Sequence, residues 1–175
     1  MNDFFLAKSR SILENQENFI KECFYLKDKF SKKFEGQDTT FSYKEYNVFA
    51  ATAPSPIWWD LFTEIHQVIR QNLPHAHRLW MQSWLNFHEH DEVLDWHNHT
   101  WPYHGYVCIE PQDTTTVFED YEIKNEMGNI YFGSGYKPHK VRNDTQFDGI
   151  RMTIGFDVCL SPSRPFEQWS LMPIL

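Results

Sequence analysis

Cysteine is scarce in this sequence, and the few cysteines present are not arranged for crosslinking. Cys23, Cys108 and Cys159 are far apart, and no Cys-x-x-Cys pair occurs. An odd number of dispersed cysteines does not make the disulfide framework that stabilises small secreted domains. We therefore expect reduced thiols and a cytoplasmic protein.

Positive charge is also limited, with 16 Lys and Arg against 24 Asp and Glu and a net charge of −8. An extended nucleic-acid surface needs clustered Lys and Arg, so none is expected. No apolar run approaches the roughly 18 residues that a membrane-spanning helix needs. The N-terminus lacks the apolar segment and small-residue cleavage site of a secretory signal. We expect no membrane partner.

A chain of 175 residues has the length of one domain and can bury a hydrophobic core. We expect a single domain, residues 1–175, in three parts. Residues 1–78 would form a helical N-terminal support, residues 79–160 a jelly-roll core, and residues 161–175 a C-terminal wrap.

Two segments of the first part carry apolar residues at helical spacing. In residues 11–34 the apolar positions repeat every three or four residues, with Lys and Glu on the other face. A second helix is predicted to begin at Pro56, with Ser55 as its cap, and to stop before Pro74. Residues 41–49, between them, are rich in aromatics and are predicted as a strand.

After Leu79 the apolar period changes from helical to alternating, which predicts a series of short strands. Many short strands after two helices indicate an α+β chain with a small antiparallel barrel or jelly roll. The predicted strands cover residues 79–87, 93–99, 105–110, 115–118, 129–133 and 151–158.

Three residues on one predicted strand can reach a metal ion. Asp95, His97 and His99 alternate, and alternate residues of a strand share a face. His139 follows His97 by 42 residues and would approach from another strand or loop. Imidazole binds Fe, Zn, Cu and Ni alike, so the histidines predict a metal site without naming the metal.

An anion site is predicted beside it. Arg151 begins an apolar strand 12 residues after His139, and Thr153 lies on the same face. A guanidinium binds a carboxylate through two parallel hydrogen bonds, and a threonine hydroxyl adds a third donor. Asn86, on the strand before the predicted metal strand, is a further candidate polar partner.

In this order and spacing, the residues resemble the active-site pattern of the 2-oxoglutarate/Fe(II)-dependent oxygenases. Residues 80–158 carry the resemblance, which is most similar to small predicted oxygenases of marine bacteria and their phages. It implies a double-stranded β-helix, a cupin-like jelly roll, under the N-terminal helices. The motifs that carry it are Trp96-His97-x-His99, Gly105-Tyr106-Val107, Pro138-x-His139-x-Val141 and Arg151-x-Thr153-Ile154-x-Phe156.

The resemblance also implies residue roles. His97 takes the position of the first iron ligand and His139 that of the distal histidine, while Arg151 and Thr153 take the position that binds the far carboxylate of 2-oxoglutarate. The departure is His99, where the family usually has a carboxylate. Either His99 is the third ligand, or an oxygen comes from elsewhere, with Asp95, Glu110 and Asp113 as the candidates.

The implied activity is that of an Fe(II)- and 2-oxoglutarate-dependent dioxygenase, a hydroxylase whose substrate the sequence does not specify. Two alternatives remain open. One is a three-histidine, cupin-type dioxygenase that does not use 2-oxoglutarate, in which Arg151 would bind the carboxylate of the substrate itself. The other is a metal-binding jelly roll without enzymatic activity.

Overall fold

A computed structural model describes residues 4–32, 40–41, 45–92, 94–160 and 170–174. The long helices are α1 (Arg10–Ser31) and α3 (Pro56–Asn72). Ser9 caps the start of α1, and its side chain accepts a hydrogen bond from the amide of Ile12. Both helices predicted from apolar spacing are thus present. Ser55 precedes α3 without capping it, because its hydroxyl instead donates to Glu22.

The strand predicted for residues 41–49 is wrong over most of the part that the structure describes. Strand β2 (Thr40–Phe41) has two residues, and a short helix, α2 (Val48–Ala51), covers the other end; residues 42–44 lie outside the described residues. The Asn47 side chain accepts from the amide of Phe49 and donates to the carbonyl of Met81. This cap stabilises a helical start that aromatic content alone did not predict.

The strands form two antiparallel sheets. The larger sheet has the order β1-β7-β4-β9-β3-β10, with β2 beside β3, and the smaller has the order β6-β5-β8. Their bounds are β1 (Phe4–Lys8), β3 (Leu79–His88), β4 (Tyr103–Glu110), β5 (Thr114–Phe118), β6 (Glu122–Lys124), β7 (Asn129–Ser134), β8 (His139–Asn143), β9 (Arg151–Cys159) and β10 (Met172–Ile174).

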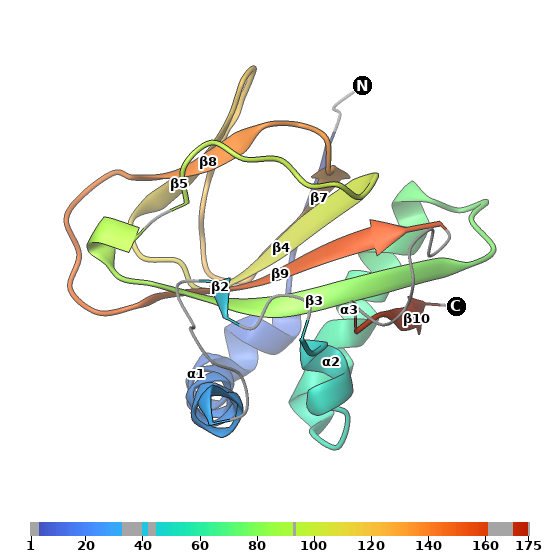
Figure 1. Cartoon of the computed structure of the whole chain (residues 1–175), viewed down its shortest axis with the longest axis horizontal. Helices are drawn as coiled ribbons and strands as arrows, with labels where there is room; N and C mark the ends of the chain where they lie inside the picture. The colour runs from blue at the N-terminus through green and yellow to red at the C-terminus, as the bar shows by residue number, and fades with distance from the viewer. Residues whose placement is uncertain (1–3, 33–39, 42–44, 93, 161–169, 175) are drawn as a thin grey trace.

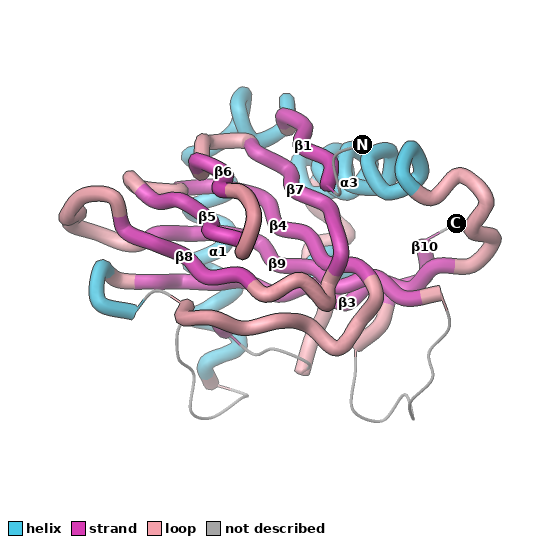
Figure 2. Tube along the Cα trace, turned by 90° about the horizontal axis from the view of Figure 1, so that it is seen from above, coloured by secondary structure: helices cyan, strands magenta, loops and turns pink. Residues whose placement is uncertain are grey.

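The helices and the smaller sheet lie on opposite sides of the larger sheet (Figure 1). Seen from above in Figure 2, β6, β5 and β8 lie side by side near β4 and β9. The expected α+β architecture, with N-terminal helices packed on a double-stranded β-helix, is confirmed. None of the helices in the described ranges is both long and apolar enough to cross a bilayer.

Strand β9 is buried along its whole length and has two chemically different faces. Met152, Ile154, Phe156 and Val158 belong to the apolar core that also contains residues of α1 and α3. The alternate residues, which point to the opposite face, include Arg151, Thr153 and Asp157. The face turned toward the smaller sheet therefore carries polar groups in a buried place.

A strand was predicted for residues 93–99, but residues 94–99 do not form one. A 3₁₀ turn, His90–Glu92, is followed by an irregular segment. It meets β8 through an isolated bridge between His97 and His139 and through a hydrogen bond from the amide of Val141 to the carbonyl of Leu94. Val93 lies outside the described residues. Of the C-terminal wrap predicted for residues 161–175, the structure describes residues 170–174, in which β10 pairs with β3.

Candidate active site

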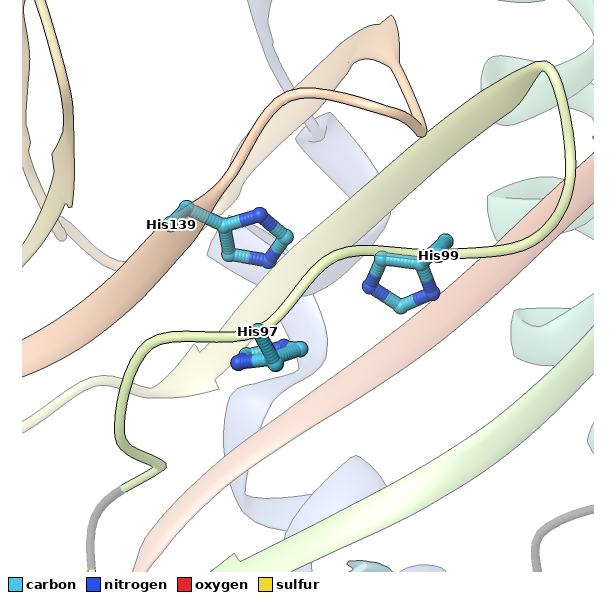
Figure 3. A group of neighbouring side chains, drawn as sticks. All are labelled: His97, His99 and His139. Carbon is cyan, nitrogen blue, oxygen red and sulfur yellow. The ribbon is translucent and has the colours of Figure 1, made fainter.

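Three histidines converge between the irregular segment and the first residue of β8. The amide of His97 donates to the carbonyl of His139 and the amide of His139 to that of His97, both at 2.9 Å. The amide of His99 donates to the carbonyl of Gly135. One ring nitrogen from each histidine lies within 4.8 Å of the other two, and Figure 3 shows the rings around a shared space. The structure thus brings together the three histidines singled out from sequence.

Hydrogen bonds fix which nitrogen of each ring remains available. His97 Nδ1 lies 2.7 Å from the carbonyl of Asp95, and His139 Nδ1 lies 3.1 Å from the carbonyl of Lys137. A carbonyl oxygen can only accept, so each Nδ1 carries the proton and each Nε2 keeps its lone pair. Burial lowers the pKa of His97, and burial with the neighbouring His104 and His97 lowers that of His139 to about 2. Both rings are therefore neutral, the form that binds metal.

His99 is oriented by a buried carboxylate. Its Nδ1 lies 2.9 Å from Asp157 Oδ1, and the Asp157 side chain is 1% exposed. The other nitrogen, Nε2, is buried and has no hydrogen-bond partner among the described residues. Metal-binding histidines commonly donate their second N–H to a carboxylate, which fixes the ring and raises its basicity. The vacant Nε2 of His99 therefore fits a metal ligand.

His104 shares the same carboxylate. Its Nδ1 lies 3.1 Å from Asp157 Oδ1, and its ring stacks on His99 with centroids 3.7 Å apart. Burial alone would raise the pKa of Asp157, but hydrogen bonds from His104 and His99 hold it below the usual value. His99, His104 and Asp157 also form a possible metal group. Their facing atoms already satisfy one another by hydrogen bonding, so the three-histidine group fits a metal better.

The carboxylates considered as alternative ligands lie elsewhere. Asp95 accepts from the amide of Trp96, Glu110 accepts from Gln16, and Asp113 is partly exposed and pairs with Lys124. None of them belongs to either group of converging ligand atoms in the described ranges. The buried carboxylate near the histidines is Asp157, which touches His99 rather than replacing it.

Arg151 is 3% exposed on the polar face of β9. Its Nη1 donates to His88 Nδ1 at 2.9 Å, and its Nε donates to Thr114 Oγ1 at 3.3 Å. Burial lowers the pKa of the guanidinium, but an arginine remains charged. No carboxylate among the described residues lies within ion-pair distance of it. A buried cation with only neutral partners fits a site for an anionic ligand.

Thr153 and Asn86 lie opposite each other on β9 and β3 and are hydrogen bonded. Asn86 Nδ2 donates to Thr153 Oγ1 at 3.1 Å, and Trp84 Nε1 donates to Asn86 Oδ1 at 3.1 Å. The Trp84 ring stacks near His99, with centroids 6.0 Å apart, and covers Gly155, where a Cβ atom would meet the indole at 2.5 Å. These contacts connect the histidine cluster to the side chains around Arg151.

Sequence reasoning missed three side chains of this site: Asp157, His88 and Thr114. For Asp157, the signal was a lone carboxylate in an otherwise apolar strand, since an unpaired buried charge is costly. For His88, it was the end position on a strand that pairs with β9, where it lies opposite Arg151. Thr114 approaches from the smaller sheet and had no usable sequence signal.

No protein-family model and no curated protein matches this sequence at a significant level. Solved structures do match in fold. HygX from Streptomyces hygroscopicus, with nickel and 2-oxoglutarate bound, gives a TM-score of 0.60 at 14% identity over 90% of this chain and 82% of HygX. AviO1 from Streptomyces viridochromogenes Tue57 gives 0.61 at 12% identity over 94% and 92%.

SnoN, a non-haem α-ketoglutarate-dependent epimerase from nogalamycin biosynthesis, gives a TM-score of 0.56 at 10% identity over 95% of this chain and 80% of SnoN. Identities this low establish similarity of fold and nothing finer. The jelly-roll architecture is thus shared with these proteins, and the chemistry must be argued from the side chains.

Proposed function

We propose that this protein is an Fe(II)- and 2-oxoglutarate-dependent oxygenase, a hydroxylase acting on a substrate not yet identified. The observation that carries the proposal is the pairing of two features. One lies on the buried polar face of β9, and the other lies beside that face, where His99 contacts Asp157. Three imidazoles converge with free Nε2 atoms, and a buried guanidinium nearby has no carboxylate partner among the described residues. One feature suits a divalent metal and the other a carboxylate.

The similar structures support this choice of ligands. HygX has been crystallised with iron and with nickel and 2-oxoglutarate, and SnoN is an α-ketoglutarate-dependent enzyme. In the present chain, His97, His99 and His139 would hold the metal. Arg151 would bind the far carboxylate of 2-oxoglutarate, with Thr153 adding a hydroxyl that Asn86 orients. When bound, iron and 2-oxoglutarate supply the oxidative chemistry, in which dioxygen converts the co-substrate to succinate and carbon dioxide and hydroxylates the substrate.

The chain itself contributes charge and position. A third histidine in place of a carboxylate leaves the site one negative charge short of the usual family pattern. Asp157 places a buried negative charge on the far side of His99, at 2.9 Å from Nδ1. A carboxylate that accepts the second N–H of a ligand makes the imidazole a stronger donor. Asp157 would thus compensate part of the missing charge without contacting the metal.

The first test is an anaerobic titration of the protein with Fe(II) and 2-oxoglutarate, followed by visible absorption. Chelation of iron by the keto acid is expected to give a weak visible charge-transfer band, which appears only when both are present. Succinate production during screening of candidate substrates then tests turnover. Absence of the band in iron-loaded protein would contradict the proposed co-substrate.

The second test concerns Arg151. Breaking a buried guanidinium–carboxylate pair typically costs about 2–5 kcal/mol of binding, so Arg151→Ala should bind 2-oxoglutarate much more weakly. Arg151→Lys keeps the charge but loses the planar fork, so it should lose less. Calorimetry on manganese-loaded protein measures both. Metal content should be unchanged, because Arg151 offers no ligand atom. Equal 2-oxoglutarate affinity in Arg151→Ala and wild type would remove this role.

These tests also separate the alternatives. A three-histidine dioxygenase that oxidises its substrate directly would bind iron and consume oxygen without forming succinate. A metal-binding jelly roll without activity would bind iron tightly and turn over nothing across a broad substrate set.

A further inference from the structure

The partners of the Arg151 guanidinium are all uncharged. Among the described residues, it donates to one imidazole nitrogen of His88 and to one hydroxyl of Thr114. A guanidinium has five N–H donors, so three of them remain for other acceptors. Both the charge and most of the donor edge of this buried side chain are therefore uncommitted.

The contact with Arg151 determines the state of His88. A guanidinium nitrogen can only donate, so His88 Nδ1 must be the acceptor, and the proton of the neutral ring lies on Nε2. The side chain is fully buried. Burial, the charge of Arg151 and the nearby His97 lower the pKa of His88 to about 3. His88 is thus a neutral acceptor beside a buried cation.

We propose that His88 is the positioning residue of the anion site: it holds the Arg151 guanidinium by a neutral hydrogen bond and leaves its positive charge for a ligand carboxylate. This inference rests on the proposed function for the identity of the ligand, 2-oxoglutarate. The geometry supports it because His88 and Arg151 are directly opposed in the β3–β9 register. That register sets the two side chains next to each other on the polar face of the larger sheet.

The neutrality of position 88 is the essential property. A carboxylate in the same place would pair with Arg151 internally, as most buried arginines are paired. It would accept the hydrogen bonds of the Arg151 guanidinium and neutralise the positive charge that a ligand carboxylate needs. If residue 88 only filled space, ligand binding would not depend on the charge of its side chain.

The test compares His88→Glu with His88→Gln. The glutamine side chain has the same length and shape as glutamate but carries no charge. On manganese-loaded protein, His88→Gln should bind 2-oxoglutarate within a few-fold of wild type, because its amide oxygen accepts from Arg151. His88→Glu should bind at least about tenfold more weakly, with the same manganese content. Its melting temperature without ligand should equal or exceed that of His88→Gln, and 2-oxoglutarate should no longer raise it.

A third variant, His88→Leu, keeps the test valid if His88→Glu does not fold. It removes the acceptor without adding charge, and it should weaken 2-oxoglutarate binding about tenfold relative to His88→Gln. Equal affinity in wild type, His88→Leu and His88→Glu would overturn the proposal. Equal loss in folded His88→Gln and His88→Glu would also overturn it, because charge would then not matter.

Glutarate, which has both carboxylates but no keto group, separates failure of this inference from failure of the proposed function. If glutarate binds the wild type and responds to the His88 variants while 2-oxoglutarate binds no better, the anion site stands and the proposed co-substrate does not. If neither compound binds the wild type, both proposals are overturned.

Discussion

At the residue scale, the site depends on the hydrogen bond that each imidazole donates from its protonated nitrogen, Nδ1. His97 and His139 donate to backbone carbonyls, and His99 donates to Asp157. Each ring thereby presents Nε2 to the same space. The backbone partners cannot be removed by mutation, but the carboxylate can, which makes Asp157 the testable member of this arrangement.

Asp157→Asn should keep the fold and weaken metal binding. The amide oxygen can still accept from His99, but the negative charge that strengthens the ligand is lost. Loss of such a partner typically costs 10–100-fold in metal affinity, so a decrease of about that size is expected. Competition with a metal indicator measures it. Asp144→Asn, which removes a partly exposed carboxylate paired with Lys124, is the matched control and should leave the affinity unchanged.

His139→Ala should abolish stoichiometric iron binding, because it removes one of three converging donors. Elemental analysis of protein reconstituted with Fe(II) gives the measurement. His77→Ala removes an exposed histidine outside the cluster and serves as the control. Full iron content in folded His139→Ala protein would show that the metal is held elsewhere.

At the scale of the element, β9 carries stability on one face and the site on the other. Phe156 is fully buried in the apolar core, whereas Thr153 faces Asn86 on the polar side. A one-residue shift in the β3–β9 register would exchange the two faces. The long pairing between these strands, from Trp80 with Cys159 to His88 with Arg151, opposes such a shift.

Substitutions on the two faces of β9 should therefore have different effects. Phe156→Ala should lower the free energy of unfolding by about 3–5 kcal/mol through loss of core packing, with unchanged 2-oxoglutarate affinity below its melting temperature. Thr153→Val keeps the volume but removes the hydroxyl, so it should weaken 2-oxoglutarate binding and cost about 1–3 kcal/mol of stability through the unpaired amide of Asn86. Denaturant unfolding and calorimetry test both. Equal effects on binding would contradict the assignment of faces.

At the scale of the whole molecule, the helices cover one side of the larger sheet and the smaller sheet covers the other (Figure 1). The interior between the sheets contains several neutral histidines. Burial lowers the pKa of His88 to about 3, of His104 to about 4 and of His139 to about 2. In the unfolded chain, the same groups titrate near pH 6.5.

This difference predicts loss of stability in mild acid. Below about pH 6.5 the unfolded chain binds protons that the folded chain does not, so the free energy of unfolding falls as the pH falls toward the folded-state pKa values. Denaturant unfolding at pH 7.5 and pH 5 should show a clear decrease. Bound metal should make the decrease steeper, because protons compete for its ligands. The double variant His88→Gln/His104→Gln should show a shallower pH dependence than wild type. An identical slope would contradict the explanation.

The sequence alone determined the features that depend on neighbours along the chain. Apolar spacing predicted α1, α3 and most of the longer strands, since a helical or alternating period follows directly from side-chain direction. The close spacing of His97 and His99 in the sequence, and the Arg-x-Thr of Arg151 and Thr153, drew attention to residues that the structure places in the histidine cluster and on the polar face of β9. These patterns need no knowledge of which strands pair.

Tertiary structure decided the partners. Asp157 meets His104, and His88 meets Arg151, only because the strand order places β9 between β4 and β3 in one particular register. Likewise, residues 93–99 were predicted as a strand from alternation, but residues 94–99 are irregular. They meet β8 through the bridge between His97 and His139 and a hydrogen bond from the amide of Val141 to the carbonyl of Leu94. Hydrogen-bond partners far apart in the chain are set by the order and register of strands, which local periodicity does not encode.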